Sequence, residues 1–395
     1  MAIIDTIKSI LSVKLKPRHD TYTDQFSRIF LVKVLMISAL LVGLNWYNEK
    51  ADCIIPAKLG LDGKFAAQAC WINGFYVYEE IRSHANEVGF YGIPRNARFD
   101  GRYQEGELCE VGGDQANRNR ACMPMKKTFF LQYQYMTFVM AILAMFYYMP
   151  YAIFRLVNQD IASLKGSLKD STADVIVNTY FNYQVNTVSK LRGRILGNLG
   201  VKVIYIVVNV AAFIILDGIL NGVFRSYGPA WMNWSKLNNT MAYDYMGKRN
   251  YPKPGNELLP TFGFCEVFEI AKDVLHTKIN RHKIVCELSQ HILYQYVFII
   301  LWFAMVFGIV VSVIGLLVQI VGHLVTVLCF QKAGNHARQM YNALTLRECE
   351  YLEFIRRKNV PVYGQVIEKL KKDRLGGLTT KQSSFVDDNH NGKNA

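Results

Sequence analysis

The chain has 395 residues, of which 51% are apolar and 19% are charged, and its mean hydropathy is +0.10. In soluble globular proteins about a quarter of the residues are charged, so the charged fraction here is low. In addition, the apolar residues gather in long runs and the charged residues lie between these runs. This pattern excludes an ordinary soluble enzyme, a disordered chain and a collagen-like fibre. The net charge of +14 suggests a nucleic-acid partner at first sight, but the distribution of the charge along the chain indicates otherwise.

Four apolar runs are long enough to cross a bilayer, which takes about 20 residues in a helix. They cover residues 29–46, 128–149, 201–220 and 293–323, and the last run stays apolar to about residue 330. Four such runs are hard to hide in the core of a soluble helical protein. We therefore expect an all-α membrane protein with four transmembrane helices, α/β extracellular loops and a helical cytoplasmic domain. The last helix should tilt or continue beyond the bilayer.

The charges between the runs predict the orientation. Residues 1–28 are too polar for a cleavable signal peptide, so the first run should stay in place as an anchor, and four spans put both termini on one side. The segments 1–28, 151–202 and 324–395 carry 24 Lys or Arg against 13 Asp or Glu, while 47–127 and 222–290 carry 20 against 17. The positive-inside rule then places the termini and the segment 150–200 in the cytoplasm, and 47–127 and 221–292 outside. The basic excess can face anionic lipid, so no nucleic acid is needed.

The cysteines are grouped in agreement with this orientation. Six lie in the two outer loops and two beyond the last span: Cys53, Cys70, Cys109 and Cys122; Cys265 and Cys286; Cys329 and Cys349. An even number in an oxidising compartment predicts three disulfides. A metal site is disfavoured because the chain has no C-x2-C pair and no histidine at zinc-site spacing. We expect Cys329 and Cys349 to be free thiols, because the cytosol is reducing. Two N-x-[ST] sequons, at Asn233 and Asn238, lie in the second outer loop, where glycosylation is possible.

The cytoplasmic parts have patterns of their own. Ile3, Ile4, Ile7, Ile10 and Leu11 recur at helical spacing near the N-terminus, which predicts a short amphipathic helix. Residues 156–198 and 332–375 are compatible with mixed-charge helices that pack into a cytoplasmic domain. The chain becomes polar after about residue 378, and we expect disorder there.

Several of these segments together resemble the innexins, the gap-junction proteins of invertebrates, which are related to pannexins. Residues 53–76, CIIPAKLGLDGKFAAQACWINGFY, are similar to the first-loop pattern of that family, and residues 260–286 to its second loop. The five residues Gln132, Tyr133, Gln134, Tyr135 and Met136 lie where innexins carry a YYQWV signature; Tyr133 and Gln134 match it, and Thr137 replaces the proline that usually follows. The resemblance covers roughly residues 20–330.

The resemblance implies an oligomeric ring of six to eight subunits, with eight favoured, whose outer loops dock onto a ring in the next cell. It implies crossed disulfides between the loops, Cys53 with Cys286 and Cys70 with Cys265, which leaves Cys109 and Cys122 to pair locally. It also implies that the N-terminal segment lines the pore, with Ala2, Ile3, Asp5, Thr6 and Ser9 as the candidate lining residues. The alternative for that segment is a helix lying on the inner membrane surface.

The functional hypothesis that follows is a channel subunit at cell junctions of the plasma membrane, passing ions and small metabolites between cells. Two alternatives stay open: an undocked hemichannel that releases small molecules such as ATP, which the sequons motivate, and a tetraspan adhesion protein. The chain contains no P-loop, G-x-S-x-G, H-E-x-x-H or dinucleotide fingerprint, so neither an enzyme nor a cofactor is predicted.

Overall fold

The computed structural model describes residues 21–48, 51–55, 61–83, 88–94, 99–104, 107–110, 123–170, 172–237, 253–270, 279–332 and 344–387. They belong to two compact units. The sheet unit contains the described residues of Leu31–Met145 and Ala211–Phe307, and the helical unit contains those up to Phe30, Phe146–Val210 and those from Gly308 onward.

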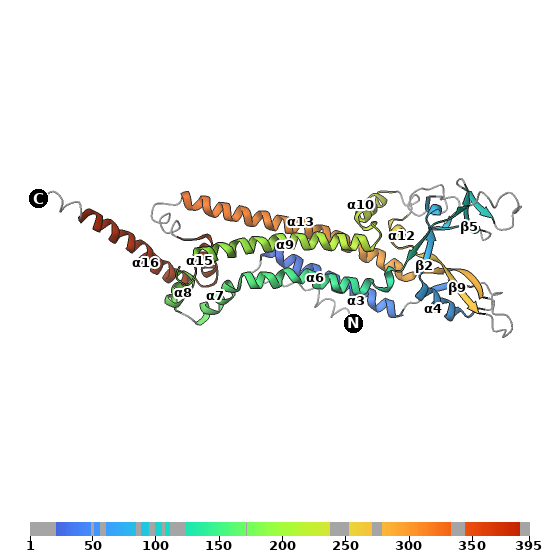
Figure 1. Cartoon of the computed structure of the whole chain (residues 1–395), viewed down its shortest axis with the longest axis horizontal. Coiled ribbons are helices and arrows are strands. Elements are labelled where there is room, and N and C mark those ends of the chain that lie inside the picture. The colour runs from blue at the N-terminus through green and yellow to red at the C-terminus, as the bar shows by residue number, and fades with distance from the viewer. Residues whose placement is uncertain are drawn as a thin grey trace. The chain divides into compact units, whose positions relative to one another are not determined.

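Among the described residues, four helical stretches are long and apolar enough to cross a membrane: Tyr22–Leu44, Met136–Val157, Val188–Ile219 and Ser289–Val325. The first combines α2 (Tyr22–Gln25), a π-helical segment η1 (Phe26–Leu31) and most of α3 (Val32–Asn48). The others are α6 (Met136–Val157), α9 (Val188–Ile219) and α13 (Ser289–Lys332), labelled in Figure 1. The expected fold class, a mostly helical membrane protein with four spans, is confirmed.

The second and third long helices begin at residues other than the first residues of the apolar runs. Residues 128–130 belong to strand β8 (Lys127–Phe130), and Gln132–Gln134 form the short 3-10 helix η4, so the second helix begins at Met136. Phe130 is buried in the sheet unit, so its apolar character serves the sheet and not the bilayer. Helix α9 begins at Val188, and its polar first turns hold Lys190, Arg192 and Arg194, which a search for apolar runs leaves out.

The sheet unit is built on a five-stranded antiparallel sheet of order β1-β10-β9-β2-β8. Its other strands are β1 (Asp52–Ile54), β2 (Phe75–Tyr78), β9 (Phe262–Ile270) and β10 (Ile279–Glu287). The hairpin β9–β10 lies between β1 and β2, so strands from the second intervening segment are flanked on both sides by strands from the first. From Cys265 to Phe268 the burial of β9 alternates: Cys265 and Val267 are buried, whereas Glu266 is half-buried and Phe268 is exposed.

Smaller elements complete this unit. Helix α4 (Gly63–Asn73) contacts β1 and β9; Asp62 caps its first turn by accepting a hydrogen bond from Lys64 N, and Gly74, at φ 85°, ends it. The remaining elements are η3 (Glu80–Ser83), the pair β3 (Val88–Phe90) and β4 (Ile93–Pro94), the three strands β5 (Phe99–Gln104), β6 (Glu107–Glu110) and β7 (Met123–Pro124), and helices α10 (Phe224–Ser235) and α12 (Pro254–Leu258).

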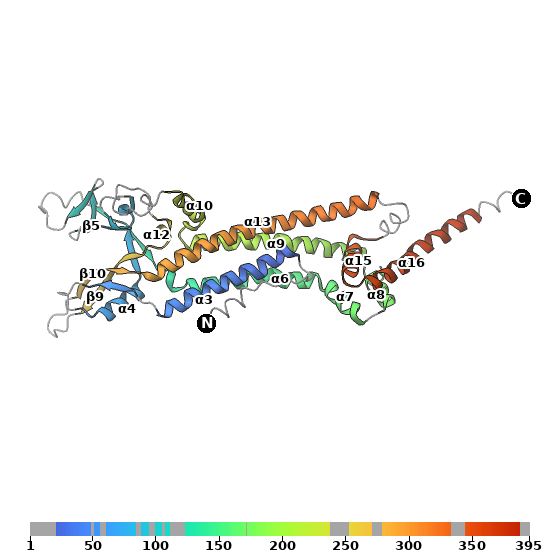
Figure 2. The same ribbon diagram turned by 180° about the vertical axis from the view of Figure 1, so that it is seen from behind.

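The helical unit contains α7 (Gln159–Asp170), α8 (Ala173–Tyr180), α15 (Leu346–Lys358) and α16 (Val360–Asp387) besides parts of the long helices. Figure 2 shows α7, α8 and α15 gathered together, with α16 leading away from them. Their apolar faces share one core, which includes Leu164, Ile176, Leu191, Leu352 and Val366. Helix α15 starts with a capping box between Thr345 and Glu348. Helix α16 extends past residue 378, where we expected order to end.

Candidate functional site

Two disulfides in the sheet unit join the segment 47–127 to the segment 221–292. Cys53 of β1 is bonded to Cys286 of β10, and Cys70 of α4 is bonded to Cys265 of β9. Cys53 lies directly opposite Cys286 in the antiparallel register, whereas Cys70 reaches the sheet from the helix packed on it. These are the two pairs that the family resemblance implied. Together with the interleaved strands, they tie the two segments into one folded body.

The cysteine sulfurs also bear on the question of a metal. Among the described residues, Cys53, Cys70 and Cys286 place their sulfur atoms within 4.8 Å of one another. All three are bonded in disulfides, so none can supply the thiolate that zinc binds. The cluster is therefore a pair of adjacent cross-links.

Glu266 is the centre of a charged and aromatic cluster on the sheet. It follows Cys265 in β9 and accepts hydrogen bonds from Tyr76 Oη at 2.7 Å and Lys127 Nζ at 2.6 Å, and it also pairs with Arg281. Lys127 lies 4.4 Å from the centroid of the Tyr76 ring. Although partial burial opposes ionisation, the hydrogen bonds from Lys127, Tyr76 and Arg281 lower the pKa of Glu266 to about 2. The carboxylate thus links β8, β2, β9 and β10.

The signature residues connect the start of α6 to α4. The Tyr133 hydroxyl donates to the Trp71 carbonyl at 2.7 Å, and Gln134 Nε2 donates to the same carbonyl at 2.9 Å. The rings of Trp71 and Tyr133 lie 4.4 Å apart between centroids. Gln132 and Met136 are buried and Tyr135 is exposed. This group therefore fixes where the second long helix leaves the disulfide-linked region.

The remaining predicted site residues are less fully described. Asn233 lies exposed near the end of α10, and Asn238 is outside the described residues. The backbone of Cys109 belongs to β6, but its side chain and the whole of Cys122 are outside the description, so their pairing stays a prediction. The candidate pore-lining residues Ala2, Ile3, Asp5, Thr6 and Ser9 are outside it as well.

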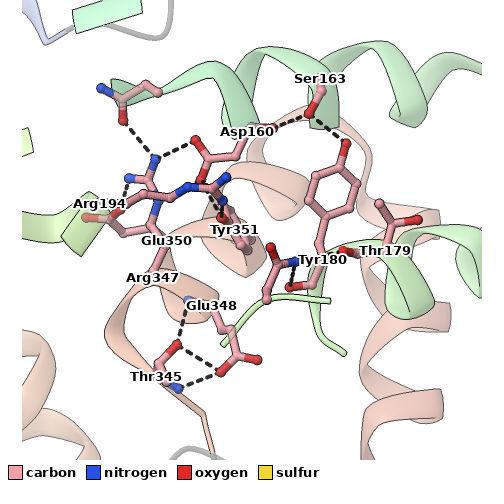
Figure 3. Close-up of polar contacts among 12 residues, drawn as sticks. Asp160, Ser163, Thr179, Tyr180, Arg194, Thr345, Arg347, Glu348, Glu350 and Tyr351 are labelled. Carbon is pink, nitrogen blue, oxygen red and sulfur yellow. Dashed lines mark hydrogen bonds and ion pairs between the residues drawn. The ribbon is translucent and has the colours of Figure 1, made fainter. Parts of the chain in front are cut away.

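Sequence reasoning missed a buried polar network in the helical unit, drawn in Figure 3. Arg347 of α15 is fully buried, and its guanidinium donates to Asp160 of α7 at 2.9 and 3.1 Å and to Asn158 Oδ1 at 2.8 Å. Arg194 of α9 donates to the same carboxylate at 3.1 Å, and the Tyr351 hydroxyl donates to it too. Asp160 therefore joins three helices through one carboxylate.

The electrostatics of this network favour its charged form. Burial alone would raise the pKa of Asp160, but the hydrogen bonds and charge of Arg347 lower it below its usual range. Burial and the hydrogen bond to Asp160 raise the pKa of Tyr351 to about 12, so its hydroxyl stays a donor. Arg347 also pairs with Glu350 at 2.6 Å, so two cations face two anions. Removing one partner of such a buried, hydrogen-bonded ion pair strongly destabilises the fold, because the other charge then stays buried without a partner.

A family model described as Innexin matches residues 20–374. The chain belongs to the innexin family. Comparison with curated proteins returns no match.

Membership in the innexin family establishes what kind of protein this is. This innexin is a multi-pass protein of the plasma membrane and a subunit of an oligomeric, large-pore gap-junction channel. Innexins are channels and not enzymes, and the alternative of a tetraspan adhesion protein is set aside. The match extends from residue 20 through α15 and into α16, so the helical unit belongs to the family pattern as much as the disulfide-linked sheet does.

Proposed function

We propose that this innexin forms rings of eight subunits whose sheet units lie outside the cell, and that two rings dock head to head so that ions and small metabolites pass between cells. The observation that carries the proposal is the pair of disulfides between the segments 47–127 and 221–292, since disulfides persist in oxidising compartments. The excess of basic residues in the segments 1–28, 151–202 and 324–395 favours the same orientation.

The interleaved sheet supports a docking role for this unit. Strands of one segment enclose the hairpin of the other, and each disulfide crosses between the two segments. Cross-linking removes much of the freedom of two long connecting segments, so the unit can present a stiff end to a second ring. A mobile loop would lose more conformational entropy on docking than this cross-linked unit does.

Epitope placement tests the orientation. One tag inserted after Asp114 in the first outer loop should be stained on intact cells, and a second tag after Ala395 should need permeabilisation. The reverse pattern would overturn the orientation and the docking with it. Electron microscopy of the purified protein tests the ring, where eight-fold paired rings are expected and another symmetry contradicts the stoichiometry.

A second candidate is an undocked hemichannel that releases small molecules such as ATP. The exposed position of Asn233 in α10 favours it, because a glycan there would add bulk to the unit that docks. Electrical coupling between paired cells separates the two functions. Coupling with the wild type supports docking; coupling that appears only with Asn233→Gln and Asn238→Gln supports the hemichannel as the native form.

We further infer that residues 2–9 line the pore, with Ala2, Ile3, Asp5, Thr6 and Ser9 as the lining residues. The apolar stripe of Ile3, Ile4, Ile7 and Ile10 supports a short helix with one face free for packing. Deleting residues 2–11 should change single-channel conductance. An unchanged conductance at normal surface expression would favour the helix on the inner membrane surface.

A further inference from the structure

The beginning of the first membrane helix is held by a line of buried polar residues within the helical unit. We call this line the polar seam; it consists of Thr21, Asp24, Ser27, Lys202, Asn209 and Ser312. Its first part is an ion pair: Lys202 Nζ lies 2.6 Å from Asp24 Oδ2, and both side chains are only 4% exposed. Lys202 also donates to the Thr21 hydroxyl. These contacts join α2, with the residue that precedes it, to α9.

The second part of the seam is a hydrogen-bonded group of three side chains. Asn209 Nδ2 donates to Ser312 Oγ at 2.8 Å and to Ser27 Oγ at 3.2 Å, and the two hydroxyls lie 3.2 Å apart. All three side chains are buried. The first helix is thus bonded to α9 and to α13 at the same level.

Two further contacts hold the same stretch of chain. The Arg28 guanidinium lies 3.8 Å above the centroid of the Tyr151 ring of α6. Gly315 of α13 lies so close to α2 that an added Cβ would be 2.5 Å from Thr23 Oγ1. The chain here is wound as the π-helix η1 between α2 and α3, a local departure from α-helical bonding that is frequent at functional sites.

Packing alone does not call for such residues. Membrane helices associate well through small and apolar side chains, and a buried ion pair often contributes less to stability than apolar residues of similar volume. Charged residues inside membrane helices more often mark function. The polar seam lies where the segment 1–20 joins the first membrane helix, next to the part of the chain that the proposed function places in the pore.

We propose that Asp24 and Lys202 are positioning residues of the channel: their ion pair, with the rest of the polar seam, fixes the base from which the N-terminal segment enters the conduction path. This inference rests on the proposed pore-lining role of residues 2–9. Because the ion pair holds the base of that segment, breaking it changes the segment's position and hence the current.

The test uses the full chain expressed in cells and recorded by single-channel patch clamp. Asp24→Asn and Lys202→Met should each change the ratio of open to closed time by about 5-fold or more, or alter the conductance. The exchange Asp24→Lys with Lys202→Asp should return the current towards the wild type, because it restores an opposite-charge pair. Currents unchanged in the single variants, or no recovery in the exchange at normal surface expression, would overturn the proposal.

A milder variant guards against failure to fold. Ser312→Ala removes one acceptor of Asn209 and leaves the ion pair, and should change the open-to-closed ratio in the same direction by a smaller factor. Ser167→Ala is the matched control and should leave the current unchanged: it removes a half-buried hydroxyl of α7 that donates to Ser163 O and lies 3.3 Å from the Tyr180 hydroxyl, outside the polar seam. If Ser312→Ala behaves like Ser167→Ala, the polar seam does not set the current.

The deletion of residues 2–11 separates the inference from the proposed function. If the deletion alone leaves the conductance unchanged, the pore-lining role is wrong whatever the seam variants do. If the deletion changes the conductance, Lys202→Met added to it should have no further effect. A further effect there would mean that the polar seam acts without the N-terminal segment, and the inference alone would be overturned.

Discussion

The Trp302 indole of α13 lies directly against Gly228 of α10, so that a Cβ at position 228 would fall 2.2 Å from the ring carbon Cε3. The indole N–H donates to the Arg225 carbonyl at 3.3 Å, which fixes the ring over this turn. Gly228 is therefore needed for the close approach of two helices in the sheet unit.

Replacing this glycine should destabilise the sheet unit. In Gly228→Ala the new methyl group forces the indole or the helix to move, and overpacking of this kind costs about 1–3 kcal/mol. Thermal unfolding of the detergent-purified protein measures the effect. Gly218→Ala in α9, where an added Cβ meets nothing within 4 Å, is the control. Equal melting temperatures for the two variants would contradict the contact.

Breaking the buried network of the helical unit should have a large effect. Arg347→Met leaves the buried Asp160 carboxylate without its main partner, and removing one member of a buried pair costs about 3–5 kcal/mol. Faster limited proteolysis of α7 and α15 would report it. Arg357→Met is the matched control, because its ion pair with Glu353 is exposed and worth about 0–1 kcal/mol. Similar proteolysis of both variants would mean that the network is dispensable.

Glu266 predicts a pH dependence in the sheet unit. Its pKa in the folded chain is about 2, below the ordinary value of 4.5, so its stabilising contribution is present above pH 4.5 and is lost as the pH falls towards 2. The melting temperature of the wild type should therefore fall more steeply below pH 4.5 than that of Glu266→Gln. Glu79→Gln, which removes an exposed ion pair with Lys126, should follow the wild-type curve. Parallel curves for wild type and Glu266→Gln would exclude this role for the carboxylate.

The disulfides can be tested one pair at a time. Removing Cys70 and Cys265 together, as Cys70→Ser with Cys265→Ser, should cost about 2–5 kcal/mol and reduce the channel current. Proteolysis of α7 and α15 should stay unchanged, because these helices belong to the other unit. Peptide mapping of the wild type without reductant should recover Cys53 joined to Cys286; recovery of Cys53 joined to Cys70 would contradict the structure.

Much of this architecture could be predicted because membrane-spanning helices are visible in the sequence as long apolar runs. The third apolar run overlaps α9 to its last residue, Ile219, and the fourth lies within α13. The four cysteines of the two disulfides fall in the two segments that form the sheet. The pairing of the cysteines came from the family resemblance, since spacing alone does not choose among alternatives. The apolar run that starts at Thr128 includes most of β8, because no charged residue separates this strand from α6.

The buried polar contacts could not be predicted, because they depend on distant parts of the chain. Asp160 and Arg347 are separated by 187 positions, and in the sequence both lie in polar segments that suggest exposed surface. The capping pattern Thr345-x-x-Glu348 could have shown where α15 starts, but no local signal shows that the arginine two residues after the cap reaches another helix. Lys202 lies near the start of the third apolar run, and no local signal shows that it is almost fully buried against Asp24.

The strand order of the central sheet has a consequence for biosynthesis. Strands β1 and β2 emerge from the ribosome long before β9 and β10. Yet among the described strands β1 pairs only with β10, and β2 needs β9 on the side that β8 leaves open. The sheet therefore closes only after translation has passed residue 287, with three membrane helices already made. Until then neither Cys53 nor Cys70 can form its native disulfide, so a nascent chain halted in the third helix carries both sulfurs without their native partners.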